Sequence, residues 1–247
     1  SIHCQILLQT RLVHPGHSLG CLVEIRLIAE DIEKAFDRVL SIFILDELRD
    51  WCIPFPVIKL IYSFLSNRMV MVKIDGYVSR LHPLDNGVPQ GSPLPVVLFT
   101  IYANSLAKSI QNLPGIDYVG IYADNIFAVS SGTPIAVAAN LNMLNNMIQN
   151  WATIRGAVIP EHKSELLHVC RKRNGCNSVI NIGNAEIAAQ NQLKILGVTF
   201  TKNLLWNEHI KGVIIKLNKI NNLLKLICSK RKGPHIETAI DICRSLT

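Results

Sequence analysis

Apolar and charged residues alternate along residues 23–30, up to Asp31. A period of two predicts a half-buried β-strand that ends at Asp31. Residues 118–129 are apolar on both sides of a polar centre, which predicts a hairpin. A second hairpin is predicted over residues 69–82, because Asp75-Gly76 favours a tight turn between strands.

Other segments repeat apolar residues every three to four positions, the spacing of a helix with one buried face. The predicted helices cover residues 35–51, 57–65, 96–111, 134–151 and 207–229. Short strands are predicted over 179–187 and 193–201, and a turn-rich loop over 86–95. Helices and hairpins in this succession predict an α+β protein.

Composition supports a folded protein, with 49% hydrophobic and 17% charged residues. The net charge is +7, and residues 201–247 carry nine Lys and Arg against three Asp and Glu. A basic segment beside a nearly neutral body favours a polyanionic partner such as nucleic acid. A solvated basic helix without a partner remains the alternative.

The seven cysteines include no CxxC pair, which favours a reducing compartment. We therefore expect an intracellular protein, in the nucleus or cytoplasm, that is not secreted. The longest apolar run, residues 95–103, is too short for a membrane helix, and no membrane partner is expected. His168, Cys170 and Cys176 lack paired ligand spacing, which disfavours a zinc site.

Two carboxylates are candidates for chemistry: Asp31, at the end of the predicted strand, and Asp124, at the tip of the hairpin over 118–129. If their strands are neighbours, the two side chains can hold Mg²⁺, or Mn²⁺ in its place, together with substrate phosphates. Each aspartate taken alone is also compatible with a simple turn or capping role.

The motifs occur in a recognisable order: Asp31 to Asp37 (DIEKAFD), Gly87 to Ser92 (GVPQGS) and Tyr122 to Asp124 (YAD). This order resembles reverse transcriptases, and the match extends from about residue 25 to residue 210. The further matching segments are Tyr62–Arg68, Gly156–Ser164 and Leu196–Val198, the last followed by Trp206 and His209. The sequence is most similar to non-LTR (LINE-type, Jockey-like) retrotransposon polymerases.

The resemblance implies a right-hand polymerase palm, an antiparallel sheet with helices on one face. Residues 1–205 would form partial fingers and the palm, and residues 206–247 the start of a basic helical thumb. The implied activity is RNA-directed DNA polymerisation. The implied partners are an RNA template, a DNA primer and dNTPs. The endonuclease and missing fingers segments are expected in the parent polyprotein.

The resemblance also implies residue roles. Asp31 and Asp124 would hold the metals beside the Ile32 carbonyl, and Lys163 would face the leaving pyrophosphate. Phe36 would exclude a ribose 2′-hydroxyl. The remaining implied substrate contacts are Tyr122, with Gln90 and Gly91 beneath the nascent base pair, and Leu196, Gly197 and Val198 at the primer end.

The sequence departs from the family pattern at several of these places. Asn125 replaces the usual second Asp of the hairpin, and Pro95, Val96 and Ser105 alter the next helix. Residues 1–24 lack the fingers motif. A catalytically inactive nucleic-acid-binding remnant is therefore a second hypothesis. A third is an unrelated Mg²⁺-dependent phosphotransferase, which predicts that Asp31 and Asp124 lie far apart.

Overall fold

A computed structural model describes residues 24–160, 163–169, 179–182 and 185–227, together with 234, 237, 238, 240, 241 and 244. The chain forms two compact units, residues 1–191 and residues 192–247. The boundary predicted between residues 205 and 206 falls inside the second unit. The assignment of fingers, palm and thumb to residue ranges stays a prediction.

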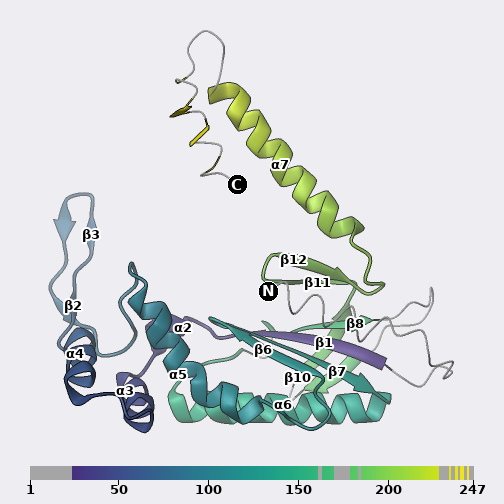
Figure 1. Ribbon diagram of the computed structural model, residues 1–247, viewed down its shortest axis with the longest axis horizontal. Coiled ribbons are helices and arrows are strands. Elements are labelled where there is room, and N and C mark those ends of the chain that lie inside the picture. The colour runs from purple at the N-terminus through teal and green to yellow at the C-terminus, as the bar shows by residue number, and fades with distance from the viewer. Residues whose placement is uncertain are drawn as a thin grey trace. The chain divides into compact units, whose positions relative to one another are not determined.

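The first unit is built on a six-stranded sheet with the order β6-β7-β1-β8-β10-β9 (Figure 1). The strands are β1 (Glu24–Asp31), β6 (Tyr118–Tyr122), β7 (Asn125–Gly132), β8 (Glu165–Val169), β9 (Val179–Ile182) and β10 (Ala185–Gln190). Neighbours are antiparallel except β8 and β10, which run parallel. The antiparallel palm sheet is therefore confirmed, with one parallel pair added.

Helices share a single hydrophobic core with one face of this sheet, as the palm architecture requires. They are α2 (Ala35–Arg38), α3 (Ser41–Asp50), α4 (Phe55–Leu65), α5 (Leu94–Ile110) and α6 (Pro134–Arg155). The longest, α6, runs along the sheet (Figure 1). It begins where the Thr133 side chain accepts a hydrogen bond from the Ala136 amide, and it ends at Gly156, whose φ is 68°.

The two faces of β1 have different surroundings. Ile28 lies opposite Ala128 and Leu166 on the neighbouring strands, and all three belong to the core shared with the helices. Because side chains alternate along a strand, Asp31 projects from the other face, away from the helices. The strand thus directs Ile28 toward the helices, while its terminal carboxylate lies on the opposite face.

An arm of two short antiparallel ladders follows α4. Strand β2 (Met69–Val70) pairs with β5 (His82–Pro83), and β3 (Lys73–Ile74) pairs with β4 (Tyr77–Val78). Asp75 and Gly76 form the turn with φ of 49° and 87°. Positive φ at both positions is what a tight two-residue hairpin turn needs, so the hairpin predicted from Asp75-Gly76 is confirmed.

The second unit contains a hairpin of β11 (Gln192–Ile195) and β12 (Val198–Thr201), followed by α7 (Asn207–Ile227). Trp206 packs against Phe200 and His209, with ring centroids 6.2 and 6.1 Å away. The His209 Nδ1 atom accepts a hydrogen bond from the Thr199 amide at 3.4 Å. These contacts hold the start of α7 against its own hairpin.

Three predicted elements differ from the structure. The helix predicted over 35–51 is broken at Val39, because the Phe36 and Val39 carbonyls accept hydrogen bonds from Val88 and Gly87 instead of from the next helical turn. The strands predicted over 179–187 and 193–201 are hairpins, and β8 was not predicted. In the part of the chain that is described, no helix is long and apolar enough to cross a membrane.

Candidate active site

Asp31 and Asp124 come together at one end of the sheet. Asp31 ends β1 and lies opposite Asn125, the first residue of β7. The Ile32 amide donates a hydrogen bond to the Asp124 carbonyl at 2.9 Å, which fastens the β6–β7 turn to the end of β1. The Asp124 carboxylate is close enough to raise the pKa of Asp31. The two carboxylates therefore share one site, contrary to the expectation for an unrelated phosphotransferase.

The turn that carries Asp124 is short and strained. It contains two residues, Ala123 and Asp124, between the paired residues Tyr122 and Asn125. Ala123 adopts a φ of 50°, in the left-handed region, which costs an L-residue with a Cβ on the order of 1–2 kcal/mol. Backbone strain of this kind persists where surrounding contacts fix the turn, as the hydrogen bond from Ile32 does here.

The electrostatics of the site favour a bound cation. Partial burial raises the pKa of Asp31 above its usual value of 3.8, and the charges of Asp124 and Glu33 raise it further. The Lys163 ammonium acts in the opposite direction and lowers this pKa, so Lys163 also lies within electrostatic reach. A carboxylate that is held beside other carboxylates and partly removed from water gains most from a divalent metal.

The donor set fits a hard divalent cation. Within the described ranges no three His, Cys, Asp or Glu side chains form a group that could enclose a metal ion. Asp31, Asp124 and the nearby Ile32 backbone nevertheless suit Mg²⁺, which commonly takes one or two protein carboxylates and completes its shell with water and substrate phosphates. The residues present are thus compatible with a metal that binds together with its substrate.

Asn125 stands beside these carboxylates as a neutral amide. Its Nδ2 atom donates a hydrogen bond to Asp124 Oδ1 at 3.0 Å. The amide therefore occupies one acceptor position of Asp124 and adds no negative charge of its own. Both effects lower the affinity of the site for a divalent cation.

The loop over residues 86–90 lies directly on α2. The Gly87 amide donates to the Val39 carbonyl at 2.7 Å, and the Val88 amide donates to the Phe36 carbonyl at 2.8 Å. A Cβ on Gly87 would lie 2.9 Å from the Asp37 carbonyl oxygen, and the φ of Gly87 is 86°. Only glycine satisfies both conditions, which explains the first glycine of the GVPQGS motif.

Phe36 and Tyr122 lie in different surroundings. The Phe36 ring is half-buried and packs against Phe99 with a centroid distance of 4.9 Å, so its position is fixed by the core. Tyr122 is 63% exposed at the end of β6. Gly91 has a φ of 110°, and a Cβ added to it would meet nothing within 4 Å.

The residues predicted at the primer end belong to the second unit. Leu196 and Gly197 form the turn between β11 and β12, with φ of 48° and 84°, and Val198 begins β12. Their role stays a prediction, as do the roles predicted for the other site residues.

Two side chains in this region were given no role by the sequence interpretation. Arg68 donates hydrogen bonds to the Asn86 and Gly87 carbonyls, each at 2.7 Å. Asp37 Oδ1 accepts a hydrogen bond from Gln90 Nε2 at 3.3 Å. Both residues lie within quoted motifs, Arg68 at the end of one and Asp37 at the end of another, but a motif position alone does not reveal a hydrogen-bond partner.

A sheet with paired carboxylates at the end of two antiparallel neighbours defines a polymerase palm. A family model described as "Reverse transcriptase (RNA-dependent DNA polymerase)" matches residues 24–200. The chain belongs to this reverse transcriptase family.

More particularly, the chain is similar to polymerases of non-LTR mobile elements, which confirms the predicted Jockey-like resemblance. It is 27% identical over 187 residues to the RNA-directed DNA polymerase from mobile element jockey of Drosophila melanogaster, covering 74% of this chain and 20% of that protein. It is 26% identical over 204 residues to the probable polymerase from transposon X-element of the same organism, covering 82% of this chain and 22% of that protein. The chain thus spans about a fifth of the length of these relatives.

Solved structures show the same fold at low sequence identity. Apo telomerase from Candida tropicalis, truncated from its C-terminal domain, matches with a TM-score of 0.58 at 14% identity over 83% of this chain and 39% of that chain. Telomerase from Candida albicans in complex with a telomeric RNA fragment matches with a TM-score of 0.56 at 12% identity over 99% of this chain and 40% of that chain. The right-hand polymerase fold is confirmed on this basis.

Proposed function

We propose that this chain is the palm-centred core of an RNA-directed DNA polymerase of a non-LTR retrotransposon. The observation that carries the proposal is the meeting of Asp31, at the end of β1, with Asp124, in the β6–β7 turn that the hydrogen bond from the Ile32 amide fastens to β1. Family membership supplies the reaction class, and the site supplies the residues that suit it.

The proposed reaction is nucleotidyl transfer. The primer 3′-oxygen forms a bond to the α-phosphorus of a dNTP and loses its proton, while the bond to the β-phosphate oxygen breaks and pyrophosphate leaves. A divalent metal bound at this site would supply positive charge to the attacking and leaving oxygens. Asp31 and Asp124 would hold this metal, with the Ile32 carbonyl beside them.

Other residues would bind and orient the substrates. Lys163 would neutralise charge on the departing pyrophosphate, since its ammonium already acts on Asp31. Phe36, held in place by Phe99, would present a ring edge that clashes with a ribose 2′-hydroxyl and tolerates deoxyribose. Tyr122, Gln90 and Gly91 would contact the incoming nucleotide and the nascent pair. Leu196, Gly197 and Val198 would support the primer end.

A second candidate is a nucleic-acid-binding remnant without catalysis. The hydrogen bond from Asn125 to Asp124 favours it, because it weakens the metal site at the position where the family has a second carboxylate. Helix α7 carries Lys211, Lys216, Lys219 and Lys225, which suit sequence-independent contacts with phosphates. This candidate predicts duplex binding that weakens with salt and is indifferent to Asp31→Ala.

Primer extension on an RNA template, with Mg²⁺ or Mn²⁺, separates the two candidates. The polymerase proposal predicts product that is abolished by Asp31→Asn and by Asp124→Asn, and that is unchanged by the charge-matched control Asp46→Asn on α3. Product from Asn125→Asp alone would identify a weakened enzyme. Absence of product from the chain and from Asn125→Asp, with duplex binding retained, would support the remnant.

A further inference from the structure

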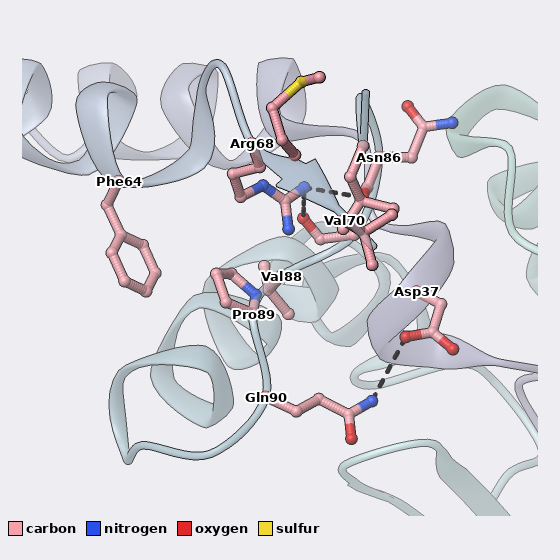
Figure 2. Close-up of a pocket in the computed structure, with 11 residues that line it drawn as sticks. Asp37, Phe64, Arg68, Val70, Asn86, Val88, Pro89 and Gln90 are labelled. Carbon is pink, nitrogen blue, oxygen red and sulfur yellow. Dashed lines mark hydrogen bonds between the residues drawn. The ribbon is translucent and has the colours of Figure 1, made fainter. Parts of the chain in front are cut away.

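A pocket of about 700 Å³ opens beside the loop over residues 86–90, and Gln90 is the one residue of its lining that already has a proposed role. Its walls come from the end of α4, the base of the arm, the loop over residues 86–90 and Asp37 of α2 (Figure 2). Apolar side chains such as Phe64, Met69 and Leu84 alternate there with a few polar groups. Apolar walls with a small number of placed polar atoms are typical of a ligand site.

Arg68 fixes the backbone of the loop on one side of this pocket. Its Nη2 atom donates to the Asn86 and Gly87 carbonyls, and its Nε atom donates to the Leu65 carbonyl at 3.1 Å, at the C-terminal end of α4. One guanidinium therefore joins the end of a helix to the loop. Lysine, with a point charge on a flexible stem, does not reproduce this fork.

Asp37 fixes the side chain of Gln90 on the other side. An ionised carboxylate only accepts hydrogen bonds, so it can receive only the NH₂ end of the Gln90 carboxamide. The observed bond runs from Nε2 to Asp37 Oδ1 at 3.3 Å. Figure 2 shows the Gln90 oxygen turned away from Asp37 as a result. The Gln90 oxygen is thereby left as an acceptor at this edge of the pocket.

We propose that Asp37 and Arg68 are positioning residues that make Gln90 accept a hydrogen bond from a donor group on a bound nucleic-acid strand. The inference rests on the proposed function and specifies which kind of chemical group on the nucleic acid Gln90 would bind. Two nucleic-acid groups offer such a donor in the minor groove: the ribose 2′-hydroxyl of an RNA strand and the 2-amino group of guanine.

The test is the affinity of the full chain for primer–template duplexes, measured by fluorescence anisotropy. Three duplexes of one sequence are compared: an RNA template, a DNA template, and a template with inosine in place of guanine near the primer end. Gln90→Ala should weaken binding of the donor-bearing duplex by about threefold to tenfold, the loss expected for one hydrogen bond. It should leave the duplex that lacks the donor unchanged, which distinguishes the 2′-hydroxyl from the amino group.

A double-mutant cycle tests whether Asp37 acts through Gln90. Asp37→Ala should weaken the same duplex by a similar factor, and Asp37→Ala with Gln90→Ala should be no weaker than Gln90→Ala alone. Asp75→Asn, at the exposed tip of the arm, controls for the lost negative charge. Because loss of a carboxylate favours binding to a polyanion, a loss of affinity on Asp37→Ala runs against the electrostatic trend.

Hydrogen exchange tests Arg68 without relying on binding. The Gly87 and Val88 amides should exchange faster in Arg68→Lys than in the unmodified chain, and the exposed Arg80→Ala variant should leave them unchanged. The lysine variant keeps the charge and serves even where Arg68→Ala fails to fold.

The outcomes separate this inference from the proposed function. Failure of the unmodified chain to bind any duplex would overturn both. If the chain binds duplex, three results would overturn the inference alone. The first is that the losses of affinity at Asp37 and Gln90 are additive, and the second is that they are the same for all three duplexes. The third is that the Gly87 and Val88 amides stay protected from exchange in Arg68→Lys.

Discussion

Asp31 lies directly opposite Asn125 across β1 and β7, on the sheet face that is turned away from the helical core. A carboxylate and an amide therefore occupy the paired positions where the family usually has two acidic residues close together.

Asp31→Asn should stabilise the protein in the absence of metal. The pKa of Asp31 is raised in the folded state, so its ionisation costs stability as the pH rises above 3.8. The asparagine variant avoids this cost, and its melting temperature should exceed that of the unmodified chain at pH 7 by on the order of 1–3 °C. Thermal melts in EDTA between pH 3 and pH 8 measure the difference. A difference that does not shrink toward pH 3 would contradict the assigned cause.

Added Mg²⁺ should reverse the order of these melting temperatures, because it stabilises the unmodified chain and has little to bind in the variant. Equal stabilisation of both proteins by Mg²⁺ would argue against Asp31 as a ligand.

Asn125→Asp should strengthen metal binding. The substitution adds a negative charge beside Asp124 and removes the amide that occupies Asp124 Oδ1. At surface dielectric values a further charge about 4 Å away contributes on the order of 1–4 kcal/mol, so the half-saturating metal concentration should fall by about tenfold or more. Calorimetric titration with Mn²⁺ and Mg²⁺ measures it, with Asn146→Asp on the exposed side of α6 as a control. Unchanged metal affinity would show that Asn125 does not limit the site.

Acid should destabilise the protein through His168. Burial lowers the pKa of His168 below its ordinary 6.5; the Arg26 charge lowers it further, and Glu24 opposes the shift. Because the unfolded chain binds this proton more readily, the free energy of unfolding should fall as the pH drops below about 6.5. Denaturant titrations at pH 7.5 and pH 5.0 should show this loss, and His168→Phe should reduce it. An equal pH dependence in both proteins would exclude His168 as the cause.

Gly87→Ala should destabilise the first unit more than Gly76→Ala. The two glycines have nearly the same φ, 86° and 87°, so both substitutions carry a similar conformational cost. A Cβ on Gly87 meets the Asp37 carbonyl at 2.9 Å, whereas one on Gly76 meets nothing within 4 Å. We expect about 1 kcal/mol for Gly76→Ala and about 2–4 kcal/mol for Gly87→Ala. Equal losses in urea denaturation would show that the loop can move away from α2.

The elements that sequence reasoning found are those with a strong local pattern. The alternation before Asp31, the polar centre of the 118–129 hairpin and the Asp75-Gly76 turn each follow from backbone and burial preferences within a few residues. The meeting of Asp31 and Asp124 depends on strand order, which came from the family resemblance and not from periodicity.

What escaped prediction depends on contacts between distant segments. The break at Val39 has no proline or glycine to mark it, because its cause is a hydrogen bond from Gly87. Likewise, the Arg68 guanidinium donates hydrogen bonds to the Asn86 and Gly87 carbonyls, which lie 18 and 19 residues further along the chain. The antiparallel pairs β9–β10 and β11–β12 are each predicted as a single strand, because apolar residues recur along both members of each pair.

The bond that joins β1 to the β6–β7 turn runs between main-chain atoms, from the Ile32 amide to the Asp124 carbonyl. This hydrogen bond therefore does not depend on which side chains stand at the two positions. A gene copy can lose an acidic residue here and keep its architecture, and one codon change can return that residue to a frame already in place.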